Sequence, residues 1–229
     1  MAQVKAGLAV PGTAYLALEQ TAGKGQRGRS WQAAAGENIM MSRVIDPSPL
    51  PLTAQFGLSS AIALGCYDFF KKYAGEEDCR IKWPNDLYWQ DRKAGGILIE
   101  NLLSAGGEWK TAIAGVGINI NQKAFPETAA GAVSLLQVTG KQHDIYVLAA
   151  ELYQAQDYWL ELLKTKGAGT VLEAYNRILY KKGEKVKLRK EGQVFETRVT
   201  GVNLKGQLIT TDPVEQCWDH GMVEWVREA

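Results

Sequence analysis

A glycine-rich, basic loop near the start of the chain contains the first residues whose types and spacing could do chemistry. Residues 23–31 read GKGQRGRSW. The glycines would let the backbone approach an anion closely, and the three cationic side chains would supply charge and hydrogen bonds. We therefore expect a site for a phosphate or another anion here, with a solvated basic turn as the alternative.

Two well-known phosphate motifs match this loop but fail on context. Residues 23–28 satisfy G-x-G-x-x-G, and Asp46 lies about where the ribose-binding acid of a dinucleotide site would be. However, only eight residues separate Gly28 from Glu37, too few for the helical crossover that such a site needs. The P-loop pattern also fails, because Arg29 stands at its lysine position and no helix follows. The loop is predicted to hold phosphate in another way.

Three further segments carry polar side chains in unusual settings. Residues 82–86 read KWPND, residues 93–100 read KAGGILIE, and residues 115–121 read GVGININ. Taken alone, Asp86 could form a turn after the proline, and Lys93 could be a solvated lysine. Asn119 is more informative, because an amide inside an apolar strand needs a hydrogen-bond partner.

The hydrophobic pattern predicts the elements that must position these segments. Strands are expected, in a mostly antiparallel or mixed sheet, at residues 14–19, 38–45, 80–83, 87–89, 96–103 and 109–120. Helices are expected at residues 52–73, 145–164 and 170–181, with Gly183 as the last C-cap. Short strands at residues 185–188, 194–202, 207–210 and 223–226 are typical of a small β-barrel. We expect two domains, residues 1–182 and 183–229.

The composition excludes several classes of protein. The 229 residues are 46% apolar and 22% charged, which argues against disorder. A formal net charge of +1 gives no general basic field, so we expect neither DNA nor a membrane as partner. The three cysteines are odd in number and lack metal-ligand spacing, which indicates a reducing compartment. With only two histidines, we expect no histidine-rich metal centre. No apolar run reaches the roughly 18 residues of a membrane span, and Pro11 and Gly12 interrupt the N-terminal one, so a cytoplasmic protein is expected.

Taken together and in order, the four motifs resemble those of biotin protein ligases. That family has a glycine-arginine loop ending in tryptophan, a K-W-P-N-D motif, a K-x-G-G-I-L-x-E motif and a G-x-G-x-N-x-N strand. Here all four fall between Gln20 and Asn121, and the tail is similar to the family's small SH3-like domain. The resemblance implies an α+β fold, with a mixed β-sheet catalytic domain and packed helices followed by a small SH3-like β-barrel.

The resemblance also implies a reaction and its substrates. The family activates biotin with ATP to biotinoyl-AMP, releases pyrophosphate, and passes biotin to one lysine of a biotin carboxyl carrier protein. Lys93 and Arg29 would be the catalytic residues, with Lys93 between the biotin carboxylate and the α-phosphate. Asp86 would hold Mg²⁺ directly or through water, since hard cations prefer oxygen ligands.

The family's motifs divide the other site residues between the two substrates. The biotin side would comprise Gln20, Lys24, Gly25, Gln26, Lys93, Gly95 and Gly96, with the Gln20 amide suited to a neutral ureido ring. The ATP or adenylate side would comprise Arg27, Arg29, Trp31, Asn85, Asp86 and Asn119.

Two departures from the family pattern lead to further expectations. Gln26 stands at the family's second arginine position and brings no charge, so we expect the adenylate to escape faster than from an arginine-bearing relative. The family's first strand and its Ser-Thr-Asn signature do not precede the loop, and we expect Met1 to be an internal methionine rather than the true start. No helix-turn-helix module precedes the loop either, so we expect a simple ligase without a repressor domain.

Other interpretations remain open at this point. A lipoate or octanoate transferase of the same superfamily is one, although the K-W-P-N-D and K-x-G-G-I-L-x-E pair favours biotin. A non-catalytic module that binds biotin or a nucleotide is another, and only turnover separates it from an enzyme. The resemblance also allows two chains to pair through a sheet edge as a homodimer.

Overall fold

A six-stranded sheet forms the centre of the larger part of the molecule. The computed structural model describes residues 4, 6–28 and 30–226. The strands lie in the order β1-β2-β6-β5-β4-β3, and every neighbouring pair is antiparallel. Their bounds are Ala14–Ala17 for β1, Asn38–Ile45 for β2, Cys79–Lys82 for β3, Asp86–Trp89 for β4, Arg92–Leu103 for β5 and Trp109–Asn119 for β6. Of the two expected sheet arrangements, the described strands take the antiparallel one.

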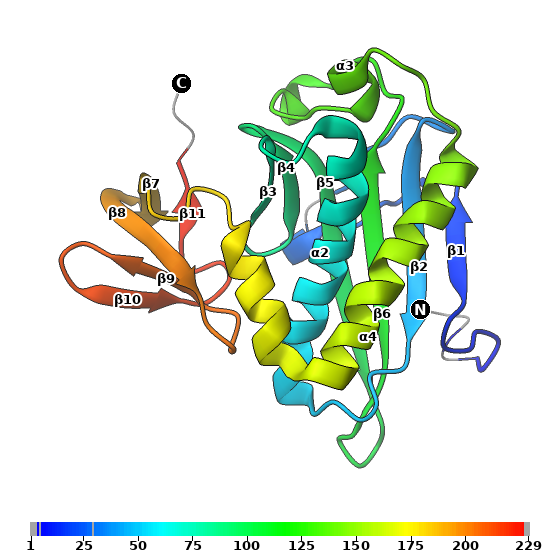
Figure 1. Ribbon diagram of the computed structural model, residues 1–229, viewed down its shortest axis with the longest axis horizontal. Helices are drawn as coiled ribbons and strands as arrows, with labels where there is room; N and C mark the ends of the chain where they lie inside the picture. The colour runs from blue at the N-terminus through cyan, green and yellow to red at the C-terminus, as the bar shows by residue number, and fades with distance from the viewer. Residues whose placement is uncertain (1–3, 5, 29, 227–229) are drawn as a thin grey trace.

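Two long helices, α2 (Gln55–Ala74) and α4 (Ile145–Arg177), lie over one face of this sheet (Figure 1). Most of α2 is buried because it lies between the sheet and α4. The two helices approach closely at Gly65, where a Cβ atom would lie 2.7 Å from the Cα of Gln156. Helical geometry is interrupted in α4 at Gly167, between the two helical segments that the sequence predicts.

The alternation of side chains along β6 separates the core from the opposite face of the sheet. Successive residues of a strand point to opposite sides. Ala112, Ala114, Val116 and Ile118 are buried in the hydrophobic core. The residues between them include two glycines, and one of these, Gly117, pairs with Gly96 of β5. On the face without helices, β6 therefore has no side chain at these two glycines, which allows another group to approach its backbone closely.

A second, five-stranded sheet follows, in the order β10-β9-β8-β7-β11. Its strands are Lys185–Lys190 for β7, Gln193–Val202 for β8, Leu208–Thr211 for β9, Glu215–Trp218 for β10 and Glu224–Trp225 for β11. Hydrogen bonds help hold it against the rest: Trp83 Nε1 donates to Gly206 O at 2.8 Å, and the Asn176 side chain makes two hydrogen bonds to the Val202 backbone. The expected SH3-like character and the boundary at residue 183 stay predictions.

The end of α4 differs from the sequence-based expectation. Gly183 was expected to cap this helix, and that prediction is wrong because α4 ends at Arg177. The reason is that the next residues pair with β3: Ile81 N donates to Ile178 O and Tyr180 N donates to Ile81 O. Strand β10 and the short helix α3 (Leu135–Thr139) are not among the elements expected from the sequence.

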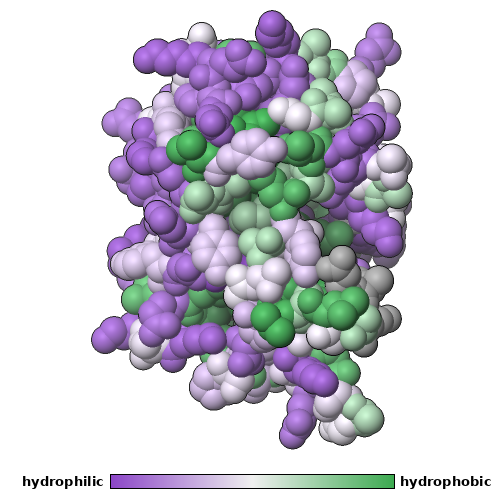
Figure 2. All heavy atoms as spheres, turned by 90° about the vertical axis from the view of Figure 1, so that its right-hand side faces the viewer, coloured by the Kyte–Doolittle hydropathy of each residue, from purple (hydrophilic) through white to green (hydrophobic). Residues whose placement is uncertain are grey.

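The edge of the large sheet at β1 faces the viewer in Figure 2, where apolar side chains gather near the middle of the surface. A shallow groove here is lined by Leu16 of β1, Met41 of β2 and Ala149 and Tyr153 of α4, among others. None of the helices in the described part of the chain is long and apolar enough to cross a membrane.

Candidate functional site

One large cavity, about 920 Å³ in volume, brings together the polar motifs found in the sequence. Its walls come from the glycine-rich loop, the turn between β3 and β4, strands β5 and β6, and a connection at residues 125–132. The turn and strand at residues 220–225 of the small sheet complete it. The cavity thus lies between the two sheets, and both contribute to its lining.

The glycine-rich loop, which follows β1 in the chain, closes on itself. The Trp31 amide donates to Gly23 O at 2.9 Å, and a Cβ atom at Gly23 would lie 2.4 Å from the Trp31 carbonyl oxygen. Only glycine fits this approach. Residues Gln26–Gly28 form one 3-10 turn in which Arg27 is left-handed, with φ 56° and ψ 40°. Such a backbone is unfavourable for arginine, so the loop holds Arg27 in this conformation at some energetic cost.

The Trp31 indole lies directly against Gly117 of β6. A Cβ atom at Gly117 would be 2.6 Å from both Cε2 and Cζ2 of Trp31. The indole Nε1 is buried and has no hydrogen-bond partner among the described residues. A flat aromatic ring on a bare strand offers a stacking surface with a spare donor.

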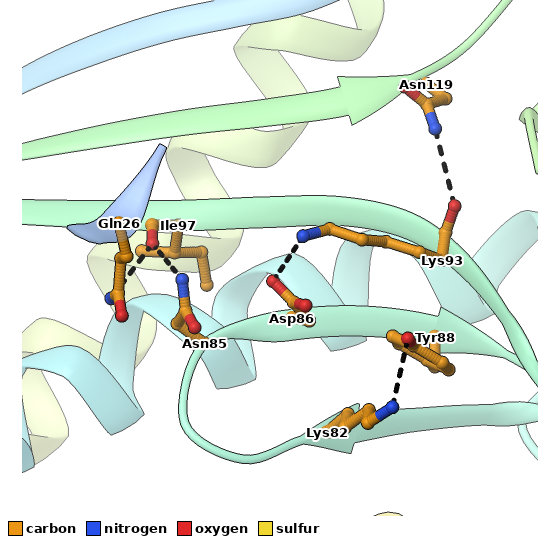
Figure 3. A network of polar contacts seen from close by, with 8 residues as sticks. All are labelled: Gln26, Lys82, Asn85, Asp86, Tyr88, Lys93, Ile97 and Asn119. Carbon is orange, nitrogen blue, oxygen red and sulfur yellow. Dashed lines mark hydrogen bonds and ion pairs between the residues drawn. The ribbon is translucent and has the colours of Figure 1, made fainter. Parts of the chain in front are cut away.

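The K-W-P-N-D segment forms the turn between β3 and β4, and α4 fixes it from behind. The Tyr175 hydroxyl donates to Pro84 O at 3.1 Å. Burial, followed by the charge of Asp86, raises the pKa of Tyr175, so the hydroxyl stays a neutral donor. On the cavity side, Asn85 Nδ2 donates to Ile97 O at 2.5 Å (Figure 3). The turn therefore presents its polar side chains to the cavity from a rigid support.

Gln26 of the glycine-rich loop reaches the same carbonyl. Its Nε2 lies 3.4 Å from Ile97 O, close to the limit for a hydrogen bond (Figure 3). Its Oε1 is buried without a hydrogen-bond partner among the described residues. Gln26 is therefore directed into the cavity with an unused acceptor.

Lys93 and Asp86 form the ion pair of the cavity. Lys93 Nζ lies 2.6 Å from Asp86 Oδ1, and the side chains are 32% and 24% exposed (Figure 3). The Lys93 backbone is anchored on both sides, because its amide donates to Gly131 O and its carbonyl accepts from the amide of Val133. The ammonium can therefore move between acceptors while its main chain stays in place.

Asn119 meets the expectation that its amide needs partners. It is buried, and its Nδ2 donates to Val133 O at 3.1 Å and to Lys93 O at 3.4 Å (Figure 3). Its amide donor therefore supports the Lys93 backbone directly.

Most of the predicted site residues line this one cavity. The structure brings together Gln20, Lys24, Gly25, Gln26, Arg27, Trp31, Asn85, Asp86, Lys93, Gly96 and Asn119. Gly95 does not line it; a Cβ atom there would lie 2.7 Å from Gly117 O, so this glycine allows β5 and β6 to approach instead. Arg29 lies outside the described residues.

Sequence reasoning missed the part of the wall that comes from the small sheet. His220, Gly221, Val223, Glu224 and Trp225 all line the cavity. Nothing in the local pattern of residues 220–225 indicates this, because their place depends on how two sheets pack. Lys82 and Glu100, which belong to two of the sequence motifs, line it as well.

The described residues contain no cluster of three or more His, Cys, Asp or Glu side chains arranged to hold a metal ion. Mg²⁺ in proteins keeps several waters and is often bound by one or two carboxylates and substrate phosphates. The Asp86 carboxylate in the cavity wall fits that role.

A family model and several known proteins match this chain. The model of the biotin/lipoate A/B protein ligase family matches residues 5–119. The chain is 34% identical over 170 residues to the bifunctional ligase/repressor BirA of Escherichia coli (strain K12), covering 73% of this chain and 51% of that protein. It is 33% identical over 205 residues to the biotin--[acetyl-CoA-carboxylase] ligase of Paracoccus denitrificans, covering 86% of this chain and 83% of that protein. The chain thus spans about half the length of the first relative and most of the second.

Solved structures resemble the whole described fold. The biotin protein ligase from Aquifex aeolicus in complex with biotin and ATP matches with a TM-score of 0.80 and 26% identity, covering 96% of this chain and 91% of that one. The two-sheet α+β architecture is therefore shared with that ligase.

Proposed function

We propose that this chain, which belongs to the biotin protein ligases of the biotin/lipoate A/B protein ligase family, attaches biotin to a carrier protein at the expense of ATP. One observation carries the proposal: all four polar motifs converge on one cavity that contains the Lys93 and Asp86 pair. Its volume of about 920 Å³ suits a small-molecule site that encloses most of its ligand. The similar Aquifex aeolicus ligase, whose structure holds biotin and ATP, supports the choice of substrates.

The first step would join the two substrates. A carboxylate oxygen of biotin attacks the α-phosphorus of ATP, a new oxygen–phosphorus bond forms, and the bond to the leaving pyrophosphate breaks. Because both reactants are anions, the transition state needs a cation at their junction. The Lys93 ammonium can supply it by moving from Asp86 to the reacting oxygens, since a compact ammonium follows charge easily. Arg29 would add a second charge on the phosphate side.

Asp86 would have a second role, in binding Mg²⁺. Once Lys93 turns to the substrates, the Asp86 carboxylate is available for Mg²⁺, directly or through water. When bound, the ion neutralises charge on the phosphates. Asp86 thus pairs with Lys93 in the ligand-free cavity and would hold Mg²⁺ once the substrates are bound.

The remaining residues would divide between the two ligands. Glycine-loop residues and Gln20 offer neutral donors and acceptors for the biotin head group, and Gly96 allows a close backbone approach. Trp31 would carry the adenine on its indole, with Arg27, Asn85 and Asn119 near the nucleotide. The biotin side would be Gln20, Lys24, Gly25, Gln26 and Gly96, and the nucleotide side would be Arg27, Trp31, Asn85 and Asn119.

In the second step a lysine of the carrier would take the biotinyl group. Its neutral amine attacks the acyl carbon of biotinoyl-AMP, an amide bond forms, AMP leaves, and the amine loses a proton. The proposed partner is the biotin carboxyl carrier protein or domain of a biotin-dependent carboxylase, as the name of the Paracoccus denitrificans relative suggests. Two chains could also pair along the exposed edge of β1, and sedimentation velocity would test that arrangement.

Mass spectrometry of a complete reaction tests the function. The chain is mixed with biotin, Mg²⁺-ATP and a carrier domain, and both the carrier and free biotinoyl-AMP are followed. Biotinylated carrier supports the ligase. Saturable binding of biotin or ATP without any product would leave a binding module instead, and acylation by octanoate or lipoate but not biotin would indicate the related transferases.

A further inference from the structure

Three aromatic rings surround the ammonium of Lys82 at the junction of the two sheets. Its Nζ lies 4.8 Å from the ring centroid of Tyr88, 5.5 Å from that of Tyr180 and 5.1 Å from that of Trp225. Lys82 also donates a hydrogen bond to the Tyr88 hydroxyl at 3.3 Å (Figure 3). We call these four residues the Lys82 cage.

The rings come from different parts of the fold. Tyr88 belongs to β4 of the large sheet, Tyr180 to the connection after α4, and Trp225 to β11 of the small sheet. The rings also contact one another, with centroids 5.1 Å apart for Tyr88 and Tyr180 and 5.9 Å apart for Tyr180 and Trp225. A cation within about 6 Å of a ring centroid is attracted to the ring face. Lys82 therefore attracts rings from both sheets to one point.

A second contact joins the small sheet to the glycine-rich loop. Gly221 has φ +87°, and a Cβ atom there would lie 1.4 Å from Nη1 of Arg27. The Arg27 guanidinium thus occupies the space that any side chain at residue 221 would need. The adjacent His220 ring meets Trp83 edge-on, with centroids 5.9 Å apart, so the turn is also held from the large sheet.

We propose that the Lys82 cage positions the small sheet so that its turn at residues 220–222 holds Arg27 over the nucleotide side of the cavity. Three residues of the cage, Lys82, Tyr88 and Trp225, line that cavity, as do Arg27 and Gly221, so the cage and the turn border the same site. Lys82 acts here as a positioning residue, through Trp225 and the turn. The assignment of the affected substrate rests on the proposed function.

Substitutions at Lys82 test the cage, with a matched pair elsewhere in the same sheet as control. Lys82→Gln keeps a polar side chain but removes the charge, whereas Lys82→Arg keeps a cation that stacks on aromatic rings. Lys190 lies 5.4 Å from the ring centroid of Trp218, and neither of these two residues lines the cavity. Lys190→Gln therefore removes a similar cation–ring contact from the small sheet without touching the site.

Two readouts separate positioning from general loss of structure. The first is hydrogen exchange of the ligand-free protein, followed in residues 23–28 and 220–225. The second is the apparent KM for ATP and for biotin in carrier biotinylation. We expect Lys82→Gln to speed exchange in both segments together and to raise the KM for ATP about three- to tenfold, with the KM for biotin changed less than about twofold. Lys82→Arg should retain most of the wild-type behaviour, and Lys190→Gln all of it.

The proposal is overturned if Lys82→Gln matches Lys190→Gln in exchange, or if exchange rises at residues 220–225 while the glycine-rich loop is unaffected. An equal rise in both KM values would also contradict it. The exchange measurement needs no substrate, so it decides the role of the cage even if the chain biotinylates no carrier. A failure of the proposed function is therefore distinguishable from a failure of the positioning role.

Discussion

Replacing Gly117 by alanine tests whether the Trp31 indole lies on the sheet as the structure places it. The new Cβ atom would be 2.6 Å from Cε2 and from Cζ2 and 3.0 Å from Nε1 of Trp31. Gly115, two residues earlier and on the same face of β6, is a matched control, because a Cβ atom there would lie 3.5 Å from Leu98 O, an ordinary contact.

The size of the effect follows from these distances. Carbon atoms in favourable contact lie about 3.5–4.0 Å apart, so the indole must move by about 1 Å. Overpacking of this kind costs about 1–3 kcal/mol, whereas alanine in place of glycine restricts the unfolded chain and stabilises by about 0.4–1 kcal/mol. We expect Gly117→Ala to lower the free energy of unfolding by about 0.5–2 kcal/mol and Gly115→Ala to leave it unchanged or raise it by up to about 1 kcal/mol.

Urea denaturation of the ligand-free variants measures this difference in the free energy of unfolding. The midpoint temperature of thermal unfolding should change by about 2–4 °C per kcal/mol for a chain of this size. A double-mutant cycle with Trp31→Ala makes the test specific. In that background the space above Gly117 is empty, so the cost of Gly117→Ala should vanish. An equal cost with and without the indole, or equal stability of the two alanine variants, would refute the placement of Trp31.

Three further predictions concern other residues. Lys93→Met should slow biotin-dependent pyrophosphate release by roughly 10²–10³-fold with little change in stability, because its charge is needed mainly in the transition state; a variant within about threefold of wild type would rule out that role. Gln26→Arg should reduce the biotinoyl-AMP that escapes into solution, as followed by mass spectrometry, since it adds a cation to the cavity that would hold this anion; equal leakage from both proteins would contradict this. Burial raises the pKa of the Cys66 and Cys79 thiols to about 12, so at pH 8 a thiol reagent should modify only the exposed Cys217 in the native protein and all three cysteines after unfolding.

The parts of the fold that the sequence predicts are those with strong local patterns. Strand β2 occupies residues 38–45 as expected, because it is an apolar segment with sharp ends. The sequence predicts too late an end for α4, because Gly183 is a local C-cap signal whereas the pairing of residues 178–180 with β3 is a tertiary contact. Strand β10 escaped detection since Glu215–Trp218 is mostly exposed and has no alternating pattern.

The candidate site likewise has a part that local motifs predict and a part that depends on tertiary contacts. Residues from all four motifs line one cavity, because each motif lies at a turn or on a strand of the same sheet. The wall from the small sheet could not be predicted, since contacts such as that between Trp83 and Gly206 join residues 123 positions apart. Asn119 was expected to need a partner, but only the structure identifies the partners as Lys93 and Val133 carbonyls.

Exchange of labelled pyrophosphate into ATP, measured without any carrier protein, tests the central claim most directly. If the cavity forms biotinoyl-AMP reversibly, label should enter ATP only when biotin is present, and Lys93→Met should abolish most of the exchange. Exchange that is independent of biotin, or ATP cleavage without any exchange, would contradict the proposed adenylate chemistry.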